Sequence, residues 1–282
     1  AKAGWLFPEL GQVYATLPQP ERLKKMAELL VAEENGRFSR TIANRLWRQL
    51  MGRGVVHPVD AMQTRPWNED LLDFLAGHLI ENDYDVKKFL RTIVLSQAYQ
   101  AESTVEEQEP PVEKYVYDGP IARRMSAEQF IDAVWTLTDS FPKKPHDRAA
   151  PFLQRNPESQ GHPIRATLVP SDLLQRSLGR PNREQVVTSR PTLLTMLQAL
   201  DLSNNPSLAK LLSGEASDML ARMDKMTVEE QVTDLYQRAL SRKPTSDEMT
   251  ILLELVGKEP TQAGFEDLLW SVVMLPEFQT VR

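Results

Sequence analysis

Apolar residues recur at every third or fourth position through most of this chain, and this spacing predicts amphipathic helices. The most regular stretch is residues 38–60, around which the rest of the chain is expected to be organised. Ile42, Leu46 and Leu50 lie four residues apart in it, and Trp47 lies beside them. One face of this predicted helix is therefore apolar, as in a helix that packs against a core.

Polar residues and glycines mark both ends of this central helix. Ser39 or Thr41 is expected to cap its start, because a hydroxyl accepts a hydrogen bond from a free backbone N–H group there. Gly52 and Gly54 are expected to end it, with Arg53 in the last turn or just past it. The helix is therefore predicted to end before the first of these glycines.

The same periodicity continues through the rest of the chain and predicts an all-α fold, an irregular assembly of many helices. No stretch alternates apolar and polar residues between turn signals, as a strand would. The further predicted helices lie within residues 21–34, 68–82, 85–100, 123–139, 171–179, 191–202, 206–214, 229–242, 247–258 and 264–278.

Cap residues fix the starts of four of these helices. Asn68 and Ser126 each stand directly before an apolar-periodic run and are expected to be N-caps. Thr227 and Thr245 are each followed three residues later by a glutamate, which is the pattern of a capping box. Both capping boxes lie in the last part of the chain, where the pattern is the most regular.

Composition shifts divide the chain into five predicted segments. Prolines interrupt the periodicity between residues 141 and 170, and an irregular segment of this length is uncommon in a compact domain unless it has a function or is disordered. The segments are an N-terminal arm at 1–20, a helical unit at 21–101, an acidic connector at 102–119, a central helical region at 120–225 and a C-terminal three-helix unit at 226–282.

The two ends of the chain resemble each other. Residues 46–54 align without a gap on residues 235–243, so that Trp47 meets Tyr236. Residues 89–100 align in the same way on residues 268–279. A duplicated three-helix unit is one interpretation; a chance similarity of short helical segments is the other.

Charge and cysteine content exclude several classes of function. The 282 residues carry a formal net charge of −6, which argues against a general nucleic-acid binder because such proteins neutralise phosphates with a basic face. The absence of cysteine rules out disulfides, thiolate metal sites and a covalently attached haem.

No apolar run approaches the roughly 18 residues that cross a bilayer. The chain begins at Ala1 without a signal peptide, so we expect a processed or excised piece of a longer protein.

Several sequence blocks carry a family resemblance. They include ANRLWRQLMGRGVV, LLDFLAGHLIENDYDVKKFLRTIVLSQAYQ, RRMSAEQFIDAV and LYQRALSRKPTSDE. In this order, over about residues 22–280, they resemble the helical C-terminal domain of unknown function of large planctomycete cytochrome-c-associated secreted proteins. The resemblance implies an exported protein in which this domain follows a second domain of unknown function and, in many members, a cytochrome c module.

The chain also departs from that family. Asn68 and Glu69 stand where the family commonly has a His-Pro pair, and Val187 and Thr188 stand where cysteines are often seen. No haem motif is present in this sequence. The resemblance therefore implies a location and an architecture, not an activity.

Histidines and acidic residues give only weak candidate sites. His57 and Asp60 follow the central helix and fit either an acid–base pair or the hydrogen bonds of a turn, of which we favour the turn. His146 and His162 lie in the proline-rich stretch, but a zinc site needs three or four converging ligands. We predict no metal site and no cofactor.

Arginines give the one specific candidate. Arg176, Arg180, Arg183 and Arg190 crowd a short stretch around a Gly-Arg-Pro turn. Guanidinium groups clamp carboxylate, sulfate or phosphate through paired hydrogen bonds, so these residues are the predicted anion- or ligand-binding set. The alternative interpretation is that they pair with carboxylates and helix-end carbonyls to hold loops together. Arg45, between Asn44 and Trp47, is expected to be buried with such a partner.

Together these observations predict a non-catalytic helical interaction or scaffold domain of an exported protein, periplasmic or extracellular. Its expected partners are other domains of the same or a partner exported protein, with polysaccharide as a further candidate and nucleic acid excluded. The alternative is a hydrolase acting on sulfated or acidic polysaccharide, with the arginine-rich stretch and residues 141–170 as its site. A pocket of perturbed carboxylates or histidines would favour the enzyme, and an exposed apolar patch would favour the interaction domain.

Overall fold

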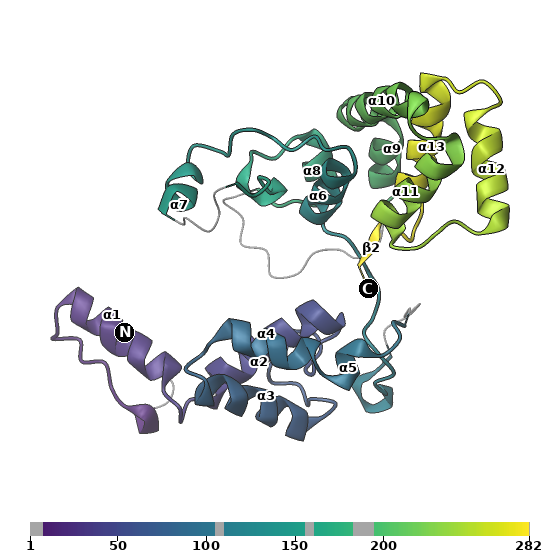
Figure 1. Ribbon diagram of the computed structural model, residues 1–282. Helices are drawn as coiled ribbons and strands as arrows, with labels where there is room; N and C mark the ends of the chain where they lie inside the picture. Colours follow the sequence, from purple (N-terminus) through teal and green to yellow (C-terminus); the bar gives the residue numbers. More distant parts are fainter. Residues whose placement is uncertain (1–7, 105–109, 156–160, 183–194, 282) are drawn as a thin grey trace. The chain divides into compact units, whose positions relative to one another are not determined.

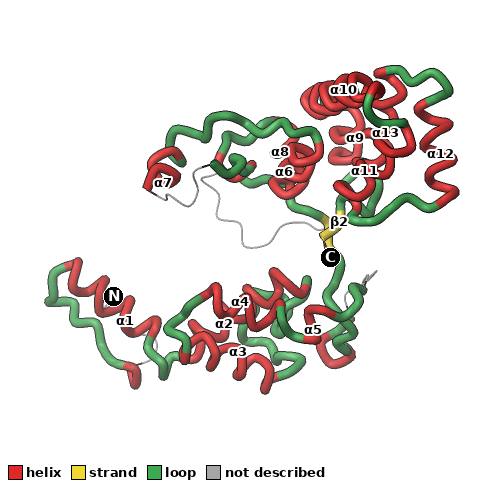
Figure 2. The backbone as a smooth tube through the Cα atoms, viewed as in Figure 1, coloured by secondary structure: helices red, strands yellow, loops and turns green. Residues whose placement is uncertain are grey.

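The computed structural model describes residues 8–104, 110–155, 161–182 and 195–281. Helices and their connecting loops make up nearly all of this described chain (Figure 2), so the predicted all-α class is confirmed. The contacts divide the chain into two compact units, a first unit of residues 1–123 and a second unit of residues 124–281. Each unit has its own apolar core.

The first unit is a small cluster of helices (Figure 1). Its core is formed mainly by α2, α3 and α4, which bury Trp47, Leu72 and Phe89 among others. The elements are η1 (Pro8–Leu10), α1 (Gln19–Val31), α2 (Gly36–Met51), α3 (Glu69–Glu81), α4 (Val86–Val94), α5 (Gln97–Gln100) and η2 (Val112–Lys114).

Helix α2 ends as predicted, at Gly52, whose φ of +85° suits a residue without a side chain. The loop beyond it is fastened by Asn44, which is fully buried on α2. The Asn44 Nδ2 group donates to the carbonyls of Val56 at 3.0 Å and Val59 at 3.2 Å, and Oδ1 accepts from the Val56 N–H at 2.9 Å. One side chain thus satisfies three backbone groups that the loop would otherwise bury unpaired.

Two expectations for α2 were wrong. The helix begins at Gly36 after Asn35, so Ser39 lies inside it and does not cap it. Arg45 is exposed rather than buried, and its Nε and Nη2 groups donate to Asp60 Oδ1 at 3.1 and 2.5 Å. Asp60 therefore serves as the carboxylate partner that Arg45 was expected to need.

The apolar face predicted for the first helix exists but is largely exposed. In α1 only Leu29 is buried, where it lies against Gly11. Leu23, Leu30 and Val31 are exposed. The helical pattern was therefore right, whereas a pattern alone does not say whether a neighbouring element covers the apolar face.

The second unit packs its helices around α13. Helix α10 makes the largest contact with α13, which fully buries Phe265, Leu268, Leu269, Val272 and Val273. The elements are β1 (Arg123–Arg124), α6 (Ala127–Leu137), α7 (Ala150–Arg155), η4 (Ala166–Leu168), α8 (Leu173–Ser177), α9 (Met196–Asn204), α10 (Pro206–Ala221), η5 (Arg222–Asp224), α11 (Val228–Leu240), α12 (Ser246–Val256), α13 (Gln262–Met274) and β2 (Thr280–Val281). The two short strands pair in one sheet.

The predicted caps are confirmed. Asn68 Oδ1 accepts from the Leu71 N–H group at the start of α3. Ser126 caps α6 through a capping box with Gln129. Thr227 and Thr245 open α11 and α12 with the two predicted capping boxes. A capping residue acts within one helical turn, so the start of a helix can be predicted from its cap without knowledge of the tertiary fold.

The two predicted halves of a duplication are each three helices, α2–α4 and α11–α13. The aligned aromatic residues Trp47 and Tyr236 are both buried in their own cores. The main packing partners differ, because α3 packs mostly on α2 whereas α13 packs mostly on α10. The duplication therefore stays a prediction.

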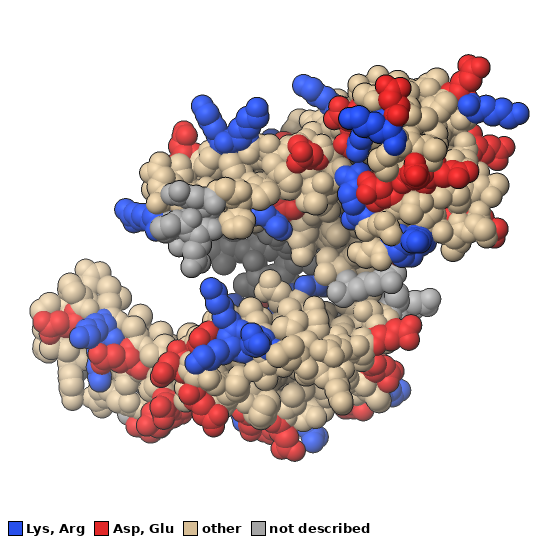
Figure 3. Space-filling model, in the orientation of Figure 1, with Lys and Arg blue, Asp and Glu red and all other residues tan. Residues whose placement is uncertain are grey.

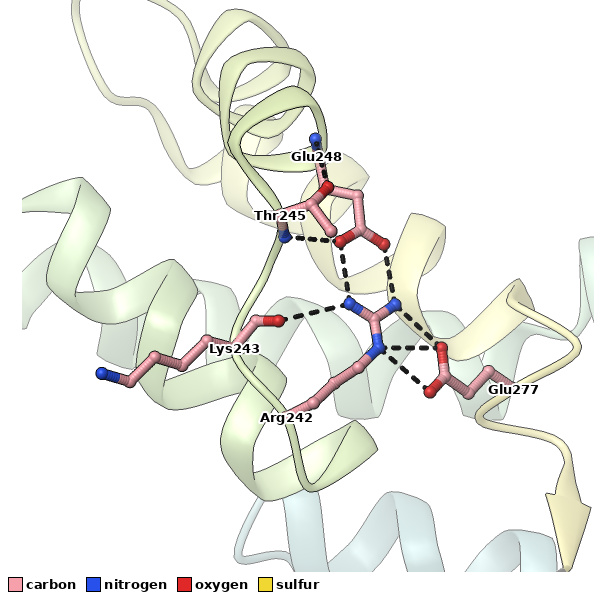
Figure 4. Close-up of polar contacts among 5 residues, drawn as sticks. All are labelled: Arg242, Lys243, Thr245, Glu248 and Glu277. Carbon is pink, nitrogen blue, oxygen red and sulfur yellow. Dashed lines mark hydrogen bonds and ion pairs between the residues drawn. The ribbon is translucent and has the colours of Figure 1, made fainter. Parts of the chain in front are cut away.

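A cluster of charged residues ties the start of α12 to the end of the chain (Figure 4). Arg242 donates to both Glu248 oxygens at 2.8 and 2.7 Å and to Glu277 at distances from 2.8 to 3.2 Å. Glu248 also accepts from the Thr245 N–H group at 2.7 Å as part of the capping box. Hydrogen bonds from Arg242 and then from Thr245 lower the pKa of Glu248 to about 2.

This shift predicts a dependence of stability on acid. The folded-state pKa of Glu248 lies below its ordinary 4.5, so its contribution is complete above that pH and is lost as the pH falls toward about 2. Glu248→Gln should therefore be less stable than the wild type at pH 6, and the difference in Tm should shrink between pH 4.5 and 2.5. Thermal melts followed by circular dichroism measure this, with Glu254→Gln on the exposed side of α12 as the control. A difference that stayed constant with pH would contradict the assignment.

Candidate interaction surface

Helix α6 presents two carboxylates to the irregular part of the second unit. Glu128 and Asp132 lie four residues apart, so they share one face of the helix. Both residues are buried. Buried carboxylates require hydrogen-bond donors, and the arginine-rich stretch supplies them.

Asp132 fastens the chain just before the turn η4. Its Oδ1 accepts from the Ala166 N–H group at 2.7 Å, and its Oδ2 accepts from Arg165 Nε at 2.8 Å. Ala166 is itself fully buried. Asp132 thereby fixes the end of the proline-rich stretch against α6.

Arg180 makes the second fastening, in the turn after α8. Gly179 precedes it with a φ of +94°, which turns the chain back toward α6. Its Nη1 donates to the Ala166 carbonyl at 2.9 Å and to Gln175, and its Nη2 donates to the Val169 carbonyl at 3.0 Å. Its Nε lies 3.6 Å from Glu128 Oε1, and both of these side chains are nearly buried.

These contacts show where the structure places the predicted arginine set. Arg180 has the carbonyl and carboxylate partners of the structural interpretation, whereas Arg176 is exposed and donates from Nε to the Asp172 carbonyl at 3.3 Å. Arg183 and Arg190 lie outside the described residues. The two described members of the set, Arg176 and Arg180, have separate partners, and the anion site stays a prediction.

Helix α9 packs against α8 and is anchored by a polar contact with Arg124 of β1. Gln198 is buried, and its Oε1 accepts from Arg124 Nη1 at 3.1 Å and from the Thr195 N–H group at 3.1 Å. Burial lowers the pKa of Arg124. The capping box of Thr195 and Gln198 thus begins α9 and also sets its rotation, with Gln198 and Leu202 turned inward.

The same rotation turns three large apolar side chains outward. Met196, Leu197 and Leu200 are 82%, 64% and 56% exposed. They are one, three or four residues apart, so they lie on one side of the helix. We call these three residues the α9 face. A surface helix normally shows the opposite arrangement, with polar residues outward.

The α9 face has both neutral and charged neighbours in the described part of the chain. Ser203, Asn204 and Ser207 are exposed on α9 and at the start of α10, and the charged neighbours include Asp201, which is partly exposed on α9, and Lys210, which is exposed on α10. Leu173, at the start of the adjoining α8, is also strongly exposed. The centres of protein–protein interfaces are depleted in charged residues and enriched in methionine and aromatic residues, and the α9 face itself carries no charge.

The remaining acidic and histidine candidates have structural partners. Asp60 accepts hydrogen bonds from Arg45, and the pairing of Asp60 with His57, the less favoured of the two interpretations, stays a prediction. His146 Nδ1 accepts from the Arg148 N–H group, and no cluster of metal-ligand side chains occurs within the described residues. The buried Glu215 on α10 accepts from Arg222 at 2.5 Å and lies 3.5 Å from Arg238.

Comparison with known proteins identifies a family. The family model described as PSD1, a protein of unknown function (DUF1553), matches residues 22–256. The resemblance was expected over about residues 22–280, which extends beyond the end of that match. Neither the curated proteins nor the solved structures include a match. Among the described residues, no helix is long and apolar enough to cross a membrane.

Proposed function

This chain belongs to the PSD1 family of unknown function (DUF1553), and we propose that it is a non-catalytic helical interaction domain whose α9 face binds an apolar surface of another protein domain. The α9 face carries this proposal. The hydrogen bonds that the buried Gln198 Oε1 accepts from Arg124 and from the Thr195 N–H group hold these three side chains outward. Exposed apolar patches on soluble proteins mark interaction sites.

The small size of the α9 face and its lack of charge favour another protein domain as its binding partner. A nine-residue helix is about 13 Å long, so it contributes only part of the roughly 1,200–2,000 Å² of a stable interface between separate proteins. Contacts between domains are smaller, about 600–1,500 Å². The three side chains of the face are all apolar and supply no counter-charge for a sulfated or acidic polysaccharide.

The polysaccharide hydrolase is less well supported. Its site would use the arginine-rich stretch and the loop at 141–170. The donors of Arg180 and Arg165 are directed at the α6 carboxylates and at backbone carbonyls, where they hold that loop in place. Loop anchoring accounts for both arginines without a substrate.

Export is the second part of the proposal and rests on the resemblance to planctomycete cytochrome-c-associated secreted proteins. We place the protein in the periplasm or outside the cell, with domains of the same or a partner exported protein as its partners. Fractionation of the native cells, followed by immunoblotting with a cytoplasmic marker, tests this. Recovery only with the cytoplasmic marker would contradict it.

Site-specific photo-crosslinking tests the α9 face. A photoreactive residue replaces Leu197 in the protein in its native cells, and a matched probe replaces Ile251, an exposed apolar residue on α12. We expect the Leu197 probe, but not the Ile251 probe, to crosslink to an apolar surface peptide of one other protein domain. Equal crosslinking from both positions, crosslinks only to second copies of this chain, or none at all would contradict the proposal.

A further inference from the structure

Helix α4 of the first unit carries a second unusual surface, built from charge rather than from apolar side chains alone. Lys87, Lys88, Arg91, Val94 and Leu95 line a shallow hollow of about 640 Å³. Lysine and arginine side chains gather over the α4 part of this unit (Figure 3). We call these five residues the α4 hollow.

The cations of the α4 hollow have little internal compensation. Lys87 and Arg91 lie four residues apart on one face of the helix, where like charges repel each other. Neither forms an ion pair with a residue in the described part of the chain, and Lys88 Nζ is 4.0 Å from Asp85. A concentrated positive surface of this kind is unexpected in a chain whose net charge is −6.

The two lysines also stand at the wrong end of the helix for stability. Asp85 caps α4, which begins at Val86, so Lys87 and Lys88 lie in its first turn. The amino end of a helix dipole is positive and favours acidic residues, such as Glu69 and Asp70 in α3. Lysines in the first turn weaken the helix, and residues that weaken local structure without stabilising the fold are expected at functional sites.

We propose that the α4 hollow binds an acidic peptide segment that also carries an apolar side chain. Carboxylates of the peptide pair with Lys87, Lys88 and Arg91, and its apolar side chain covers Val94 and Leu95. The helix N-terminus adds to the positive potential that attracts the carboxylates.

The apolar end of the hollow distinguishes a peptide from other anions. Leu95 is 63% exposed and lies one turn beyond Arg91. A uniformly charged glycan or nucleic acid leaves this leucine uncovered, whereas a peptide presents acidic and apolar side chains on the same strip. The overall negative charge of the chain further opposes long polyanions. This inference is independent of the α9 face, which lies in the other unit.

Fluorescence anisotropy tests the proposal with defined probes. The ligand is a labelled twelve-residue peptide of alternating glutamates and leucines, and the comparison peptide contains glutamates only. The full chain is titrated as wild type and as a charge-reversed variant of the hollow, Lys87→Glu, Lys88→Glu and Arg91→Glu. The matched control reverses three exposed cations elsewhere, Lys143→Glu, Lys144→Glu and Arg155→Glu.

We expect the hollow variant to lose at least about tenfold in affinity for the glutamate–leucine peptide, because each charge-assisted hydrogen bond contributes on the order of a factor of ten. The control variant should bind within about twofold of the wild type. Leu95→Ser should reduce affinity for the mixed peptide to that for the glutamate peptide. The Tm of the hollow variant should equal or exceed that of the wild type, because glutamates suit the first turn of a helix.

Several outcomes would overturn the inference. Wild-type protein that does not bind the mixed peptide, or binds both peptides equally, would remove the acidic–apolar peptide as the ligand. Displacement by dextran sulfate at equal charge, or cosedimentation with phosphatidylglycerol vesicles abolished by the same variant, would assign the hollow to a polyanion or a lipid surface. Equal losses in the hollow and control variants would mean that only overall charge matters.

Discussion

Arg180→Ala is expected to lower the free energy of unfolding of the second unit by about 3–5 kcal/mol, the usual effect of removing one partner of a buried ion pair. The substitution removes the guanidinium that lies against Glu128 and leaves the Ala166 and Val169 carbonyls without this donor. Both charged side chains are nearly buried, so water replaces these contacts poorly.

Urea titration followed by circular dichroism measures this loss. Arg176→Ala is the matched control, because Arg176 is exposed on α8, the short helix just before Arg180, and should change stability by no more than about 0.5 kcal/mol. Arg180→Lys should also be destabilised, because an ammonium group cannot reach the same set of acceptors. An Arg180→Ala protein as stable as the control would mean that Arg180 is free for a ligand, as the anion-site prediction requires.

Trp47→Ala is expected to cost about 3–5 kcal/mol in the first unit, as for other buried large aromatic residues. Trp47 is buried in the core between α2, α3 and α4, and its ring lies 6.3 Å from that of Tyr117. Truncation leaves a cavity in the centre of the helix on which this unit is built. Phe74→Ala on the exposed side of α3 is the control and should change stability little. A loss under about 1 kcal/mol for Trp47→Ala would contradict the core assignment.

The sequence predicted the features that depend only on residues close together in the chain, such as the starts and ends of helices. The capping boxes and the stop at Gly52 occur where their residues stand, because each acts within one helical turn. The crowding of arginines was visible as well. Their partners were not, because Glu128 and Asp132 are distant in sequence and reach Arg180 and Arg165 only through the tertiary fold.

The α9 face could not be predicted from the sequence either. Residues 191–202 are apolar at most positions, so their periodicity does not say which side packs inward. The rotation of α9 is set by Gln198, whose partner Arg124 belongs to another element. The position of a glutamine opposite Met196 and Leu200 was the available signal, and it becomes informative only once that glutamine is known to be buried.

Titration calorimetry tests the central claim most directly. The domain identified by crosslinking is titrated into the wild type, into Met196→Ser/Leu197→Ser/Leu200→Ser, and into the control Ile251→Ser/Leu255→Ser, whose residues are exposed on α12. Truncating apolar contacts at the centre of an interface costs about 1 kcal/mol or more each, so the Kd should rise about 100-fold for the α9 variant. The control should stay within about twofold of the wild type. An unchanged Kd for the α9 variant, at an unchanged Tm, would contradict the assignment of this face as the interaction site.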